Sequence, residues 1–343
     1  MRTGVLGLLL LVSSSAFAQE ETEVPVAQRI ANALPAASVT ARGETAPVGS
    51  SNADAADDPA KSLIVGTDKK AGLYVYGMDG KARDFHPDGR LNNVDLVDMG
   101  GKVGVIVAAS DRNDKTEALL RLYRLDTAAA KLVPIGAVTG GAGEAYGICL
   151  ERSGKQLYAF SVLKSGDVHQ VRIDLSGKVP TGAIVRSLRF ATQSEGCVVD
   201  PRTRTLYVGE EDRGIWAFDS RAGAPAEGRL VAPVDRKQLV DDTEGLALAP
   251  VGRRGGYLVA SSQGDNAYTL FRLPDCKPAG RVRVVPGALG STEETDGIAI
   301  AMGSFGKDFP AGLFVVQDGD NAPAAQNFKL VSWRDVLRAV GRR

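Results

Sequence analysis

The sequence predicts an all-β protein with the architecture of a six-bladed β-propeller. A block with a polar or acidic start and an alternating apolar continuation occurs five times, beginning at Asn92, Glu144, Gln193, Asp242 and Glu294. The fourth residues of successive blocks are 52, 49, 49 and 52 positions apart. Short strand patterns follow each block, with turn signals between them. A repeat of about 50 residues that contains about four strands is typical of a propeller blade.

The first blade is predicted to be incomplete. Its block is ADDPA at residues 56–60, in which Pro59 takes the position of Asp95 but precedes it by only 36 residues. One strand's length is therefore missing, and we expect this blade to lack its inner strand. Residues 39–48 are expected to form an edge strand, and WRDVLRAV at the C-terminus is the one pattern that indicates a helix.

Residues 1–18 are interpreted as a secretory signal peptide. Arg2 precedes the apolar run Val5 to Val12, and Ala16-Phe17-Ala18 is a small-x-small cleavage site. The alternative is a membrane anchor, but the run is well short of the roughly 20 residues that span a bilayer. We expect a flexible leader over residues 19–38, one domain over residues 39–343, and a secreted or periplasmic monomer with no membrane attachment after cleavage.

Composition excludes several functions. The 41 basic and 41 acidic residues cancel, so the chain lacks the basic surface that a nucleic-acid partner requires. Two histidines argue against a histidine nucleophile or a His-rich metal site. Three cysteines allow at most one internal disulfide, and the sequence leaves open whether one forms; Cys149 and Cys197 lie in apolar runs and are predicted to be small core residues.

Acidic residues recur at the start of the blocks. In a propeller the first strand of each blade lines the central channel, so equivalent residues form a ring at one mouth. The acids expected there are Asp57, Asp58, Asp95, Glu144, Glu195, Asp242, Glu244 and Asp296. So many carboxylates repel one another unless cations lie between them, and oxygen ligands favour Ca²⁺. The alternative is that these acids are solvated strand ends.

Basic residues recur at the ends of the second strands. Lys69 and Lys70, Arg112, and Lys164 occupy this position in the first three blades, whereas the fourth has Glu210 and Glu211. Cations beside a calcium cluster cannot be ligands, but they can bind an anion that also contacts the metal. Phosphate is the natural candidate.

Eleven motifs together resemble the β-propeller phytases, which are calcium-dependent secreted enzymes that remove phosphates from myo-inositol hexakisphosphate. In chain order they are ADDPA, TDKKAGLYVY, LNNVDL, EAYG, QSEG, LYVGEEDRGIWAF, DTEGL, YLVASSQG, TDGI, LFVVQDGDN and QNFKLVSW, over roughly residues 39–335.

The resemblance implies several calcium ions and two adjacent phosphate sites, with calcium phytate as the substrate and metal-activated water as the attacking group. Tyr146, Glu195, Glu210, Asp242 and Glu244 are similar to the calcium ligands, with Asp57, Asp58 and Gln263 nearby. Glu211 is also expected to bind metal. Lys69, Lys70, Arg112 and Lys164 are similar to the residues that hold phosphate. The groups expected to act most directly in catalysis are Lys69, Arg112, Tyr146 and Glu210.

Two departures from the family pattern matter. Family members continue DDPA with an Ile-Trp strand that this chain lacks, and they carry an additional Asp-Gly before the final TDG. We therefore expect a weaker structural calcium site at Asp320 and Asn321. Two other functions remain open on the sequence: a calcium-dependent lactonase or esterase-like propeller hydrolase, and a non-catalytic propeller disabled by its short first blade.

Overall fold

The computed structural model describes residues 33–46, 53–55 and 62–342 of the chain. The predicted signal peptide, most of the leader, and the ADDPA block with Asp57 and Asp58 lie outside these residues. Among the described residues, no helix is long and apolar enough to cross a membrane.

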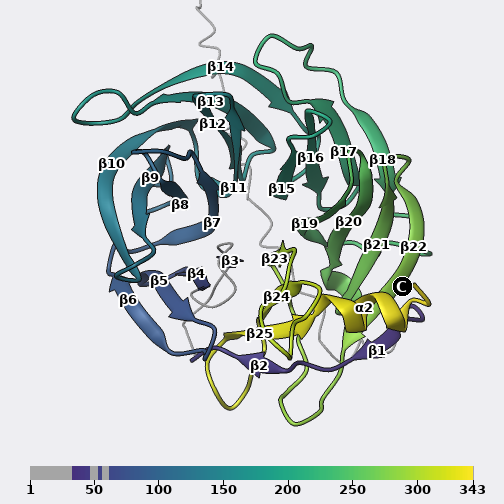
Figure 1. Ribbon diagram of the computed structural model, residues 1–343. Helices are drawn as coiled ribbons and strands as arrows, with labels where there is room; N and C mark the ends of the chain where they lie inside the picture. Colours follow the sequence, from purple (N-terminus) through teal and green to yellow (C-terminus); the bar gives the residue numbers. More distant parts are fainter. Residues whose placement is uncertain (1–32, 47–52, 56–61, 343) are drawn as a thin grey trace, which may run out of the picture.

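Six sheets, antiparallel except for one pair of strands, are arranged as blades around a central axis (Figure 1), which confirms the predicted propeller. Blade one contains β3 (Ala53–Ala55), β4 (Leu63–Asp68), β5 (Gly72–Gly77) and β6 (Ala82–His86). Blade two contains β7 (Leu91–Asp98), β8 (Val105–Asp111), β9 (Glu117–Asp126) and β10 (Lys131–Ala142). Blade three contains β11 (Ala145–Ser153), β12 (Gln156–Leu163), β13 (Asp167–Asp174) and β14 (Thr181–Arg189).

The remaining blades follow the same order from the axis outward. Blade four contains β15 (Ser194–Asp200), β16 (Thr205–Glu210), β17 (Gly214–Asp219) and β18 (Arg229–Pro233). Blade five contains β19 (Thr243–Val251), β20 (Gly255–Ser262), the 3-10 turn η1 (Gln263–Asp265), β21 (Ala267–Leu273) and β22 (Lys277–Val284). Blade six contains β23 (Ile298–Ala301), β24 (Leu313–Asp318) and β25 (Asn327–Ser332), followed by the helix α2 (Trp333–Ala339) that the sequence predicts.

Apolar side chains pack between the blades. Each of six buried clusters joins two neighbouring sheets, because the middle strands of a blade bury side chains on both faces. The boundary between blades five and six is typical: Val259 and Leu270 meet Phe314 and Val316, all essentially inaccessible to solvent. The molecule therefore has a ring of interfaces in place of a single central core.

The N-terminal segment closes this ring. β1 (Ala37–Val39) pairs in parallel with β22 of blade five, and β2 (Gly43–Glu44) pairs with β25 as the outermost strand of blade six. The predicted edge strand over residues 39–48 is thus divided between two sheets, and it begins two residues earlier than predicted. Glu44 also bonds the buried Lys329 Nζ at 2.7 Å, which ties the N-terminal strand to the last blade.

The first blade is the irregular one, as the short spacing predicts. Its innermost place is occupied by β3, which has three residues and pairs with β4 from Ala53 opposite Gly66 to Ala55 opposite Ile64. The inner strand is therefore shortened and precedes the ADDPA block. The prediction was that this blade would have no inner strand.

Cys149 belongs to the buried cluster between blades three and four and Cys197 packs against it, as predicted for small core residues. The two form a disulfide with Cα atoms 5.7 Å apart, joining β11 of blade three to β15 of blade four. The inner strands of adjacent blades share no sheet, so the sequence pattern does not reveal that these two positions face each other. Cys276 is the remaining thiol and is buried.

Candidate functional site

A β-bulge recurs at the same place in the inner strands of blades two to five. The pairing register shifts after Leu91, Ala145, Ser194 and Thr243. A bulge locally disrupts the ladder and re-aims the side chains within it. The first bulge residues in the four blades are Asn92, Tyr146, Glu195 and Glu244. The repeated irregularity therefore presents one functional side chain from each blade at the same level of the propeller.

In blades three to five a glycine follows the first bulge residue and allows neighbouring blades to approach closely, whereas blade two has Asn93 at this position. A Cβ atom on Gly196 would lie 2.2 Å from the Glu244 carbonyl oxygen, and one on Gly245 would lie 2.4 Å from the Asp296 carbonyl oxygen. Gly245 N–H donates to the same Asp296 oxygen at 2.7 Å. These glycines are therefore needed because backbone, and not a flexible side chain, occupies the space beside them.

The second strands contribute a further group of side chains. In blades one to five, the residue directly after the second strand is Lys69, Arg112, Lys164, Glu211 or Gln263. Because these strands pair with the bulged inner strands, both sets of residues lie at the same end of the blades. In blades four and five, Glu211 and Gln263 thus occupy the position that the predicted cations occupy in blades one to three.

Three buried carboxylates form the centre of the site. Glu195, Glu211 and Glu244 each offer an oxygen atom, and these atoms lie within 4.8 Å of one another. Their residues are only 1%, 3% and 4% exposed. Burial, followed by the charges of Glu195 and Glu211, raises the pKa of Glu244 well above its usual range. Its Oε2 atom has no hydrogen-bond partner among the described residues.

Lys69 is the cation closest to this centre. Its ammonium group bonds Asp296 and lies 3.8 Å from Glu195 Oε1. Burial alone would lower the pKa of Lys69, but the charges of Asp296, Glu195 and Glu244 outweigh burial and raise the pKa above its usual value. Gln263 Nε2 donates to the other Asp296 oxygen at 2.7 Å. Lys69 therefore stays protonated and partly neutralises the acids.

Tyr146 forms the wall of the site in blade three. Burial, followed by the charges of Glu195 and Glu244, raises the pKa of its phenol, which remains protonated. Gln193 Nε2 lies 3.3 Å from the phenol oxygen and donates to both Glu211 oxygens at 2.9 Å. The Lys164 ammonium lies 5.6 Å from the centre of the Tyr146 ring, so a cation borders the side of the site that Tyr146 forms.

Two polar residues of this site were missed in the sequence. Asn92 Nδ2 donates to Glu195 Oε1 and to the Tyr146 carbonyl oxygen, both at 3.0 Å, and Gln193 orients Glu211. Gln193 begins the QSEG motif, and Asn92 begins its own block, so their positions were visible. Their neutral side chains gave no signal in a search for charges.

The more exposed cations surround the mouth. Arg112 Nη1 lies 3.9 Å from Glu144 Oε1, and Lys115 Nζ lies 3.5 Å from the other oxygen of that carboxylate. Lys70 and Lys164 are exposed. These side chains are free to contact an anionic ligand that is larger than the carboxylate centre itself.

Glu210 does not join the carboxylate centre, although it was predicted as a ligand. It accepts hydrogen bonds from the backbone N–H groups of Ala191 and Thr192, both at 2.9 Å, and from Trp216 Nε1 at 2.8 Å. Adjacent residues of a strand point to opposite faces, so the sequence motif GEED cannot indicate which glutamate faces the site. Glu211 occupies the place predicted for Glu210.

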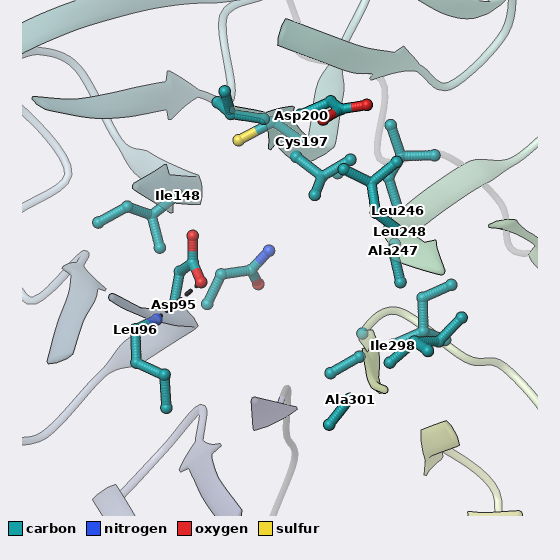
Figure 2. Close-up of a pocket in the computed structure, with 18 of the residues that line it drawn as sticks. Asp95, Leu96, Ile148, Cys197, Asp200, Leu246, Ala247, Leu248, Ile298 and Ala301 are labelled. Atoms are coloured by element: carbon teal, nitrogen blue, oxygen red, sulfur yellow. Dashed lines mark hydrogen bonds between the residues drawn. The ribbon is translucent and has the colours of Figure 1, made fainter. Parts of the chain in front are cut away.

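Asp95 lies deeper in the molecule than predicted. It lines the central channel, a cavity of about 490 Å³ bordered mainly by apolar residues such as Ile148, Leu246 and Ile298 (Figure 2). Its carboxylate accepts from the N–H groups of Leu96 and Leu150 at 2.7 and 2.6 Å.

Asp95 was predicted in the wrong place because the sequence alignment of blade two with the other blades was shifted by two residues. The bulges align Asn92 with Tyr146, whereas the repeat pattern aligned Asn92 with Glu144. A slip of two keeps every side chain on the same face, so alternation alone cannot detect it.

The remaining predicted residues lie at the margin of the site or apart from it. Asp242 is close enough to raise the pKa of Glu244 and is half-buried. Asp320 is exposed in the loop between β24 and β25, and Asn321 Oδ1 accepts from Lys329 Nζ at 3.2 Å. The structure therefore places the loop with Asp320 and Asn321 beside Lys329 of blade six, apart from the three central carboxylates.

Comparison with known proteins agrees with this geometry. The phytase family model matches residues 4–343. A curated relative, the 3-phytase of Bacillus subtilis (strain 168), is 37% identical over 330 residues, which cover 88% of this chain and 85% of the relative. A match over nearly the whole chain includes every blade and every residue of the carboxylate centre. The chain belongs to the phytase family.

Proposed function

We propose that this protein is a calcium-dependent phytase that hydrolyses phosphomonoesters of myo-inositol hexakisphosphate. The observation that carries this proposal is the buried centre of Glu195, Glu211 and Glu244 with cations beside it. Membership of the phytase family and the similarity to a 3-phytase support the reaction and its substrate. The calcium requirement rests on the chemistry of the site.

The residues present fit a calcium ion. The ligand atoms available are carboxylate oxygens, and the buried Glu244 Oε2 is left without a hydrogen-bond partner among the described residues. The two histidines lie elsewhere: His86 contacts the Leu132 carbonyl, and His169 contacts Ser187. A purely oxygen-based centre favours Ca²⁺ over Zn²⁺. Calcium bound there would neutralise the clustered charge and lower the pKa of a water molecule.

The chain's own cations perform the second part of the function. Lys69, Lys70, Arg112 and Lys164 follow the second strands of three adjacent blades, so together they can hold phosphate groups next to the carboxylate centre. Phytate carries several phosphates on one ring, and a site with several separate cations can orient one phosphate while holding its neighbour. Tyr146 remains a neutral phenol and can donate a hydrogen bond to a phosphate oxygen.

We further propose a secreted or periplasmic monomer. The disulfide between Cys149 and Cys197 supports an oxidising compartment, because such bonds persist mainly outside the cytosol. The N-terminal sequence, with its charged start and short apolar run, supports export by a signal peptide.

The test is phosphate release from phytate by the purified protein. We expect activity with calcium, its loss after treatment with EDTA, and its return when calcium is restored. Activity that survives complete chelation would contradict the metal requirement.

The phosphate sites are tested by a matched pair of variants, because Arg112 and Lys115 both approach Glu144. Arg112→Ala should lower kcat/KM for phytate about tenfold or more, whereas Lys115→Ala should have little effect. Hydrolysis of a neutral ester or lactone, without phosphate release by the wild type, would instead favour the lactonase alternative.

A further inference from the structure

The disulfide lies directly behind two residues of the carboxylate site. Cys149 follows Tyr146 by three residues along β11, and Cys197 follows Glu195 by two residues along β15. Each cysteine lies at or just beyond the bulge that presents its functional neighbour. The covalent bond therefore joins two blades at the depth where the site begins.

The site spans the boundary between blades three and four, because Tyr146 lies on one side of it and Glu195 on the other. Gly147 of blade three packs against the Glu195 carbonyl of blade four, where a Cβ atom would lie only 1.9 Å away. Nearer the mouth, Gln193 reaches Tyr146 at 3.3 Å, which is at the long end of the hydrogen-bond range. A small separation of the two blades would displace Tyr146 from Glu195.

Electrostatic repulsion acts on blade four from the side of blade five. Glu195 and Glu211 belong to blade four and Glu244 belongs to blade five, and their buried oxygens lie within 4.8 Å of one another. Carboxylates this close repel strongly at low dielectric, and the blades that carry them are otherwise held together by apolar packing. The disulfide joins blade four to blade three on its other side, and it limits movement of blade four relative to Tyr146 without depending on a bound cation.

We infer that the Cys149–Cys197 disulfide is a positioning pair for the site, which holds Tyr146 and Glu195 in the arrangement that binds calcium. This inference rests on the proposed calcium site. Cys197 also lines the central channel (Figure 2), so a small reductant in the channel reaches the bond from that side. Calcium affinity should therefore depend on the oxidation state of this pair.

The experiment is calorimetric titration of calcium into substrate-free protein at a temperature well below the melting transition. Cys149→Ala/Cys197→Ala should bind calcium about tenfold more weakly than the wild type, which is the size of effect typical of residues that orient metal ligands. The control is Leu206→Ala, which opens a cavity in the same blade boundary and leaves both cysteines in place. It should lower the melting temperature but leave calcium affinity unchanged.

A second measurement covers the case in which the double variant does not fold. Folded wild type is reduced, its free thiols are counted by mass spectrometry after alkylation, and the calcium titration is repeated. Weaker calcium binding after reduction supports the inference. Equal affinity within twofold, in either the folded double variant or the reduced wild type, overturns it and leaves the disulfide as a staple of stability. Absence of calcium binding by the oxidised wild type would instead contradict the proposed function.

Discussion

Glu210 and Glu211 are adjacent glutamates whose side chains have very different surroundings. Both are almost fully buried, but Glu210 accepts four hydrogen bonds from fixed donors, whereas Glu211 accepts from Gln193 and faces two other carboxylates. These contacts suit Glu210 to a structural role and Glu211 to binding a ligand.

Substitution of each glutamate by glutamine separates these roles. Glu211→Gln should abolish measurable calcium binding and reduce phosphate release about a hundredfold or more, because a ligand charge is lost. Glu210→Gln should keep calcium binding but lower the free energy of unfolding by about 2 kcal/mol, since a buried amide cannot accept all of these bonds. Calorimetry and urea unfolding measure the two effects. The reverse pattern would show that Glu210 is the ligand.

The raised pKa of Glu244 predicts how the calcium-free protein responds to pH. Its folded-state pKa lies above the unfolded value, so the folded state binds a proton more tightly. The contribution of Glu244 to stability in EDTA should therefore be fully present below the usual glutamate pKa and be lost as pH rises through the raised pKa. Glu244→Gln should flatten that dependence. Melting temperatures measured across this range test the prediction, and a stability that rises with pH in EDTA only for the wild type would contradict it.

At the scale of the element, the bulge with its following glycine is the unit that builds the site. The bulge occurs in four inner strands and turns one side chain per blade toward the mouth, and in blades three to five a glycine follows it. The adjacent glycine brings the next blade's backbone close enough for those side chains to meet.

Gly196→Ala should disrupt this unit. The new methyl group would meet the Glu244 carbonyl oxygen at 2.2 Å, so the backbone of blade four or five must move. We expect a loss of about 2 kcal/mol in unfolding free energy together with a large loss of calcium affinity. Gly223→Ala is the control, because nothing lies within 4 Å of a Cβ atom there. Calcium affinity that is unchanged in Gly196→Ala would show that the close approach does not position the ligands.

Sequence patterns at the scale of strands predicted most of the blades but not their detailed register. Spacing and alternation identified the inner and second strands, the C-terminal helix and the short first blade. They placed Asp95 two residues out of register, because a slip of two preserves alternation. They also could not indicate that Cys149 faces Cys197, since contacts between neighbouring blades have no local sequence signal.

At the scale of the whole molecule, ring closure depends on a charged cluster that joins the N-terminal strand to blade six. Lys329 is 1% exposed and contacts Glu44 at 2.7 Å, Asp318 at 3.2 Å and Asn327 at 3.0 Å. Burial raises the pKa of Asp318 to about 6, even though Lys329 acts to lower it.

Removing this lysine should weaken closure of the propeller. Lys329→Met leaves the buried Asp318 without its cation and should lower the free energy of unfolding by about 3 kcal/mol. Lys102→Met, at an exposed turn, should change it by less than about 0.5 kcal/mol. Urea unfolding monitored by tryptophan fluorescence gives both values. Equal stability of the two variants would show that the cluster does not secure the ring.

At the mouth of the propeller, blades four, five and six bring Glu195, Glu211, Glu244 and Asp296 together, and blade one adds Lys69. The central claim is that Glu195, Glu211 and Glu244 bind calcium there. The most direct test is a crystal structure of the protein grown with calcium, with anomalous scattering used to locate the ions. We predict an anomalous peak between these three carboxylates. An active, calcium-loaded crystal with no peak at that position, and with calcium bound elsewhere, would contradict the account.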